Sequence, residues 1–132
     1  MIKIYTNESC FFMQTNIRGF VRRSADVEEF EMDGGARIRW LITHREGAPT
    51  FSMRLITIDK GRSTPHHSHD YEHEIFVVKG ELSVQIGNEK LSAVKGDHIF
   101  IPPNEFHGMT ALSNATIICV VPIRAARMAL GD

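Results

Sequence analysis

The sequence predicts an all-β domain, a sandwich or barrel built from short antiparallel strands. Short runs rich in β-branched and aromatic residues recur about every ten residues from Gly34 onward. Glycine, proline or asparagine separates most of these runs, as tight connections between strands require. No convincing helical pattern appears before the tail that begins at Arg124.

The expected strands follow one another along the chain with little between them. They cover residues 37–42, 51–58, 74–78, 82–86, 90–94, 98–101 and 116–121. Gly87 and Asn88 form a two-residue turn of the kind that joins the strands of a hairpin. We therefore divide the chain into an N-terminal arm (1–33), a barrel (34–123) and a C-terminal tail (124–132). The first part of the arm has no periodicity and is expected to be loosely held.

Composition narrows the possible functions. A chain of 132 residues is long enough for one domain with a core and too short for two. The net charge of −1 gives no basis for binding nucleic acid or an anionic membrane. No apolar run approaches the roughly 20 residues of a membrane span, and the N-terminus has no secretory apolar segment, so the cytoplasm is the expected location. Cys10 and Cys119 lie too far apart in the sequence to suggest a disulfide framework.

Histidines cluster just before one of the expected strands. Four of the seven histidines lie between residues 66 and 73, and His107 follows a Pro-Pro-Asn turn further on. His67 and His69 are two residues apart, which points both rings to one side of an extended chain, and His73 has the same parity. Neutral imidazole is the commonest protein ligand for transition metals. The spacing alone therefore predicts a metal site, with His66 facing the other way.

Two segments resemble the two sequence motifs of the cupins, which are small jelly-roll barrels with a metal near one mouth. The first motif, G-x5-H-x-H-x3/4-E-x6-G, is matched by Gly61, His67, His69 and Gly80. The second motif, G-x5-P-x-G-x2-H-x3-N, is matched by Gly96, Pro102 and His107. Asn104 stands in place of the second motif's inner glycine and Ala111 in place of its last asparagine. Asparagine tolerates left-handed backbone better than most residues.

The glutamate position of the first motif admits two alignments here, on His73 or on Glu74. The six-residue gap to Gly80 favours His73, and strand parity places His73 with Ile75 and Glu74 on the other face. Glu74 remains the alternative ligand. With His73 the predicted metal ligands are His67, His69, His73 and His107, a set similar to that of the small bacterial manganese cupins with four histidines.

This resemblance implies a jelly-roll barrel of two facing antiparallel sheets that binds one divalent metal ion. It implies manganese first, with iron, nickel or zinc as alternatives, and two adjacent coordination positions left for ligands. The implied activity is that of a metal-dependent oxidoreductase, similar to a dioxygenase, acting on a small and largely apolar organic molecule. A non-catalytic module that binds or senses a small ligand through its metal is the alternative. Homodimers are common among cupins, and a homodimer is expected here.

Alternation along the last and second strands predicts which side chains line the pocket. The resemblance places Ile117, Cys119 and Val121 inward on the last strand. On the second strand, Arg54 facing inward would need a carboxylate partner, because a lone buried guanidinium is costly. We therefore expect the set Phe51, Met53 and Leu55 to face inward. The predicted substrate pocket consists of Met53, Tyr71, Ile117, Cys119 and Val121, and no catalytic residue is predicted beyond the metal ligands.

Overall fold

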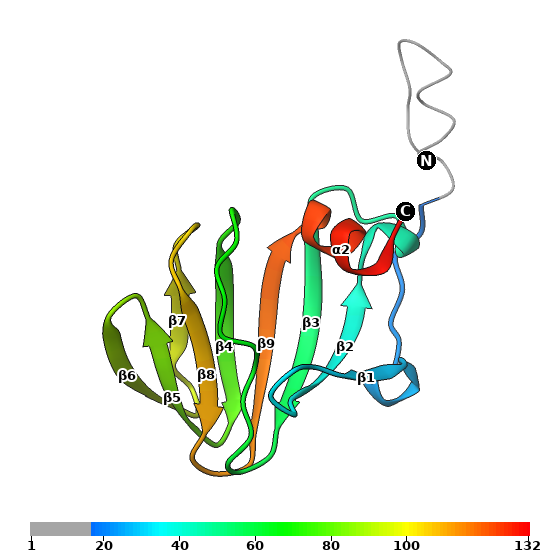
Figure 1. The fold of residues 1–132 in the computed structure, drawn as a ribbon. Helices are drawn as coiled ribbons and strands as arrows, with labels where there is room; N and C mark the ends of the chain where they lie inside the picture. Colours follow the sequence, from blue (N-terminus) through cyan, green and yellow to red (C-terminus); the bar gives the residue numbers. More distant parts are fainter. Residues whose placement is uncertain (1–16) are drawn as a thin grey trace.

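A computed structural model describes residues 17–132, so the loosely held arm predicted at the extreme N-terminus lies outside the described residues. The described chain forms two antiparallel sheets (Figure 1). Its strands are β1 (Glu29–Glu31), β2 (Arg37–Ile42), β3 (Phe51–Ile58), β4 (His73–Lys79), β5 (Glu81–Ile86), β6 (Glu89–Val94), β7 (His98–Ile101), β8 (His107–Ala111) and β9 (Ala115–Pro122). Two 3-10 turns (Ser24–Asp26 and His44–Glu46) and the C-terminal helix α2 (Ile123–Leu130) complete it.

The larger sheet has six strands and the smaller sheet three. Their orders are β1-β2-β3-β9-β4-β7 and β6-β5-β8. In Figure 1 the three-stranded sheet lies beside β4 and β7, and α2 crosses one end of the larger sheet. The prediction of an all-β fold with two antiparallel sheets is confirmed, although the two sheets are not closed into a continuous barrel.

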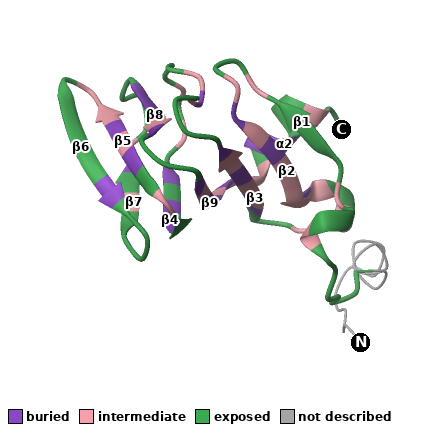
Figure 2. Cartoon of the chain, turned by 90° about the horizontal axis from the view of Figure 1, so that it is seen from below, coloured by how far each residue is buried: buried purple, intermediate pink, exposed green. Residues whose placement is uncertain are grey.

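The core lies between the sheets and draws apolar side chains from both. Val77 and Ile117 of the larger sheet and Leu82 of the smaller one are completely buried. Strands β4 and β9 alternate between buried and less buried positions over most of their length, as strands with one face toward a core do. Figure 2 shows this burial in the central strands and a largely exposed β6.

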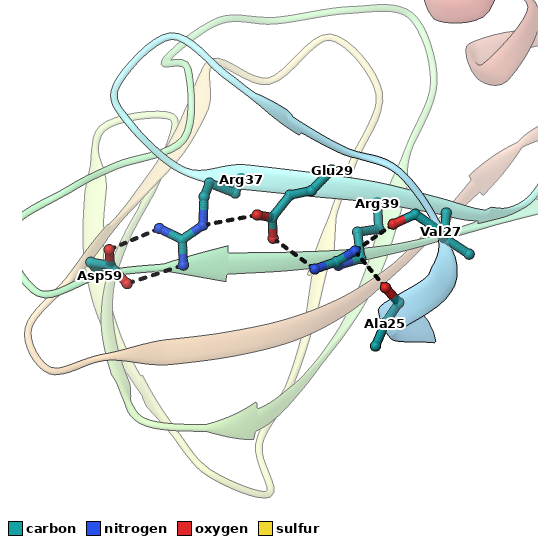
Figure 3. A network of polar contacts seen from close by, with 6 residues as sticks. All are labelled: Ala25, Val27, Glu29, Arg37, Arg39 and Asp59. Atoms are coloured by element: carbon teal, nitrogen blue, oxygen red, sulfur yellow. Dashed lines mark hydrogen bonds and ion pairs between the residues drawn. The ribbon is translucent and has the colours of Figure 1, made fainter. Parts of the chain in front are cut away.

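The edge strand β1 belongs to the stretch predicted as an arm, so the sheet begins before residue 34. Its Phe30 pairs with Ile38 of β2 in an antiparallel register. Glu29 also lies between Arg37 and Arg39, 3.4 and 3.5 Å from their guanidinium nitrogens (Figure 3). Such half-exposed ion pairs contribute little stability individually, but here they connect the edge strand to its neighbour through several contacts.

Strand β8 was not predicted from the sequence. Its residues include Gly108, Met109 and Ala111, which have little preference for strands, so residue propensities did not predict a strand here. Strand β8 forms through its pairing with neighbouring segments: Val84 of β5 lies opposite Met109, and the backbone N–H of Thr64 donates to the carbonyl of Met109 on the other side at 2.9 Å.

The helix α2 lies near the C-terminus, and no helix within residues 17–132 is long and apolar enough to cross a membrane.

Candidate metal centre

Four imidazoles from three separate parts of the chain converge at one end of the space between the sheets. His73 is the first residue of β4 and His107 the first residue of β8, while His67 and His69 lie in the extended stretch before β4. The backbones of His67 and His107 bond reciprocally, at 2.9 and 2.8 Å. The stretch before β4 is thereby fixed against β8, and histidines far apart in sequence become neighbours.

The spacing of the ring nitrogens suits coordination of a single ion. The Nε2 atoms of His69 and His73 are 2.8 Å apart. One nitrogen from each of His67, His69 and His107 lies within 4.8 Å of the other two. Nitrogens bound at about 2.1 Å to one ion are about 3.0 Å apart at right angles and about 4.2 Å apart on opposite sides. His67, His69 and His107 could therefore hold one metal ion, and His73 lies beside them through its contact with His69.

Hydrogen bonds donated by the Nδ1 atoms set the orientation of the rings of His69 and His107. Nδ1 of His69 donates to the carbonyl of Tyr71 at 2.9 Å, and Nδ1 of His107 donates to the carbonyl of Glu105 at 2.8 Å. A ring with its proton on Nδ1 has a free lone pair on Nε2. Backbone carbonyls thus hold both rings in the form that binds a metal, as the outer contacts of metal-bound histidines usually do.

Burial keeps the cluster uncharged. Desolvation is the main cause that lowers the pKa of His69 to about 4 and that of His73 to about 2, and the positive charge of Arg54 contributes to both shifts. Desolvation also lowers the pKa of His67 and His107. Neutral imidazole is the form that coordinates a metal, so at neutral pH no proton has to leave the site before an ion binds.

The C-terminal helix supports the histidine cluster through an aromatic stack that the sequence did not reveal. Tyr71 stacks on His69 with ring centroids 3.8 Å apart and an interplanar angle of 11°. The guanidinium of Arg124, at the start of α2, lies over the ring of Tyr71, 5.5 Å from its centroid. It also forms a 2.7 Å ion pair with Asp70. Tyr71 therefore lines the predicted cavity and also limits the movement of His69.

The prediction for the second strand was wrong, and its correction changes the character of the pocket. Arg54 faces inward with 7% of its surface exposed, whereas Phe51 is 66% exposed. The buried positions of β3 are Ser52, Arg54, Ile56 and Ile58. Both faces of this strand carry apolar residues, so alternation could not decide between them. Ile56 and Ile58 enter the core and bring Arg54 with them.

The cavity beside the histidines contains only part of the predicted pocket. It measures about 50 Å³, and Arg54, Tyr71 and Cys119 line it together with the four histidines. Met53 is instead half-buried on the outer face of β3, where it lines a surface depression with Pro49. Ile117 and Val121 do face inward, as predicted, but they pack in the core and are not among the residues that line this cavity.

Arg54 and Cys119 form polar contacts with each other and with His73, one of the four histidines. Arg54 and Cys119 are partners across strands β3 and β9. Nη2 of Arg54 lies 2.8 Å from Nδ1 of His73 and 2.6 Å from Sγ of Cys119, and that sulfur is 3.1 Å from the same ring nitrogen.

Glu74, the alternative ligand, is exposed on the opposite face of β4.

Comparison with known proteins agrees with this architecture. The model of the cupin domain family matches residues 54–121. No curated protein sequence matches the chain. The polyketide cyclase RemF from Streptomyces resistomycificus is similar in structure, with 26% identity and a TM-score of 0.72 over 80% of each chain.

Two further solved structures share the fold at lower identity. An RmlC-like cupin from Shewanella frigidimarina has 23% identity and a TM-score of 0.68 over 80% of this chain and 91% of its own. A predicted oxalate decarboxylase from Thermotoga maritima has 19% identity and a TM-score of 0.67 over 78% of this chain and 98% of its own. The family model spans more than half of the 132 residues and includes all four histidines of the cluster. The chain therefore belongs to the cupin family.

Proposed function

We propose that this cupin is a mononuclear metal-dependent enzyme that acts on a small organic molecule, with oxidation by O₂ as the reaction class. The observation that supports the proposal most is that four histidines line one small cavity, where nitrogens of His67, His69 and His107 lie within 4.8 Å of one another. Of the metals compatible with nitrogen ligands, Mn²⁺ is our first choice and Fe²⁺ the second. Intrinsic affinity favours Ni²⁺ and Zn²⁺ over both, so a purified sample is expected to contain whichever ion was available.

The ligand set and the walls of the cavity suggest how such an enzyme would work. His67, His69, His73 and His107 would hold the ion, and because all four are neutral it would keep its full charge for polarising an oxygen ligand. Burial raises the pKa of Tyr71 and of Cys119, so both keep their protons at neutral pH. The cavity wall therefore offers hydrogen-bond donors at the phenol and the thiol, and neither group is set up as a general base.

A second candidate reaction class is redox-neutral catalysis in which the metal acts only as a Lewis acid. The similarity to the polyketide cyclase RemF, at 26% identity, favours this alternative. A non-catalytic module that binds its ligand through the metal is the third possibility, since one fold supports many functions.

Oxygen uptake distinguishes these possibilities. The full chain would be loaded with one equivalent of Mn²⁺ or Fe²⁺ and supplied with hydroxy acids, keto acids, diketones and phenols in an oxygen electrode. We expect uptake that stops on chelation with EDTA and returns when the metal is restored. Product formation without oxygen uptake would replace oxidation by Lewis-acid catalysis. Saturable binding without any product would identify a binding module.

A further inference from the structure

The structure assigns Arg54 a role in binding the ligand: we propose that the cavity takes a small organic carboxylate, with Arg54 as its counter-charge. This inference deepens the proposed function and rests on it, because it names the chemical class of the molecule that binds at the same site. It also differs from the expectation, drawn from the sequence, of a largely apolar ligand. The surroundings of Arg54, the charge of the cavity and its size all favour such a ligand.

Arg54 is a buried cation with unused donors. Both hydrogen bonds that it forms within residues 17–132 start from Nη2, and its buried Nε has no partner. No carboxylate in that part of the chain forms an ion pair with it. A guanidinium has five N–H donors, and a buried charge without a partner costs several kcal/mol. The face of Trp40, 5.2 Å from the guanidinium carbon, compensates for only part of this cost.

No other group in the cavity supplies the missing negative charge. The residues that line it include no aspartate or glutamate. A divalent ion held by four neutral imidazoles would add two further positive charges next to Arg54. The protein alone therefore leaves the loaded cavity strongly positive, and an anionic ligand would neutralise it.

The size of the cavity limits the ligand to a small head group. Its volume is about 50 Å³, whereas pockets that enclose drug-sized ligands measure about 300–1,000 Å³. A carboxylate with an adjacent oxygen suits this cavity, because Arg54 and the four histidines that would hold an ion line the same space. Arginine binds carboxylates with short, charge-assisted hydrogen bonds.

The test compares two small probes of the same shape and different charge, glycolate and its neutral amide, glycolamide. Binding to the Mn²⁺-loaded full chain would be measured by calorimetry and by the fluorescence of Trp40, the single tryptophan. We expect glycolate to bind at least about 10-fold more tightly than glycolamide. Arg54→Met should weaken glycolate binding about 10- to 100-fold and leave glycolamide binding nearly unchanged. Arg54→Lys, which keeps the charge, should retain part of the preference.

Elemental analysis of every sample separates this inference from the proposed function. If the wild-type chain takes up no metal, the proposed function fails, and the probe comparison is made on the metal-free protein, where Trp40 fluorescence still reports on Arg54. If Arg54→Met does not fold, the wild-type ratio and the Arg54→Lys variant decide. Equal affinity for the two probes would overturn the assignment. So would unchanged glycolate binding in Arg54→Met with the metal still present.

Discussion

Replacing His73 by alanine is expected to weaken metal binding by at least about 100-fold. The substitution removes one of four ligands and leaves the Nε2 of His69 without the nitrogen that lies 2.8 Å away. His73 is buried, with 6% of its surface exposed, so the substitution leaves a cavity beside His69. Binding would be measured by titrating the metal-free protein with Mn²⁺ and counting bound ions by elemental analysis.

Glu74→Ala is the matched control for this substitution. Glu74 is the next residue of the same strand but points outward, so its removal should leave close to one ion per chain. Thermal unfolding of both metal-free variants would show whether His73→Ala only perturbs the fold. Loss of the metal in Glu74→Ala with retention in His73→Ala would mean that the carboxylate is the ligand and that the imidazole assignment is wrong.

Replacing Gly80 by alanine is expected to lower the free energy of unfolding by about 3 kcal/mol or more. Gly80 alone connects β4 to β5 and has a φ of +87°, a backbone conformation that residues with a side chain rarely adopt. A Cβ at this position would lie 2.3 Å from the carbonyl oxygen of Asn114 and 2.7 Å from Cα of Ala115. Both atoms belong to the backbone and cannot move without disturbing the start of β9.

Gly61 provides the control for Gly80, since both glycines belong to the same motif. Its φ is +86°, yet a Cβ there would have nothing within 4 Å. Gly61→Ala therefore introduces the backbone strain without the collision and should cost about 1–2 kcal/mol. Urea unfolding of both variants measures the difference. Equal losses would show that the contacts around Gly80 relax and that only its φ matters.

Much of this architecture could be predicted because spacing in the sequence and geometry in the fold agree. Strand parity places His73 and Ile75 on the inner face of β4, and the structure buries both. The same alternation grouped Ile117, Cys119 and Val121 on one face of the last strand, the resemblance to cupins placed that face inward, and the structure buries all three. The Gly87-Asn88 hairpin follows from turn chemistry and joins β5 to β6 as expected.

The errors lie where sequence alone was ambiguous or where contacts form between distant segments. Strand β3 has apolar residues on both faces, so the prediction of its inward face rested on the cost of burying Arg54. Packing of Ile56 and Ile58 in the core overrode that cost. The contacts of Arg124 with Tyr71 and Asp70 join residues 53 and 54 positions apart, and no local pattern announces them. The inward arginine is also the feature that most changes what the cavity can bind.

The proposed function of this cupin depends most on four imidazoles that hold one metal ion. Pulsed electron paramagnetic resonance of the full chain, loaded with one equivalent of Mn²⁺, counts the nitrogens bound to the ion. We predict one ion per chain with four imidazole nitrogens and a spectrum that does not change in Glu74→Ala. An ion with two or fewer imidazole nitrogens, or one whose coordination changes when Glu74 is removed, would contradict this.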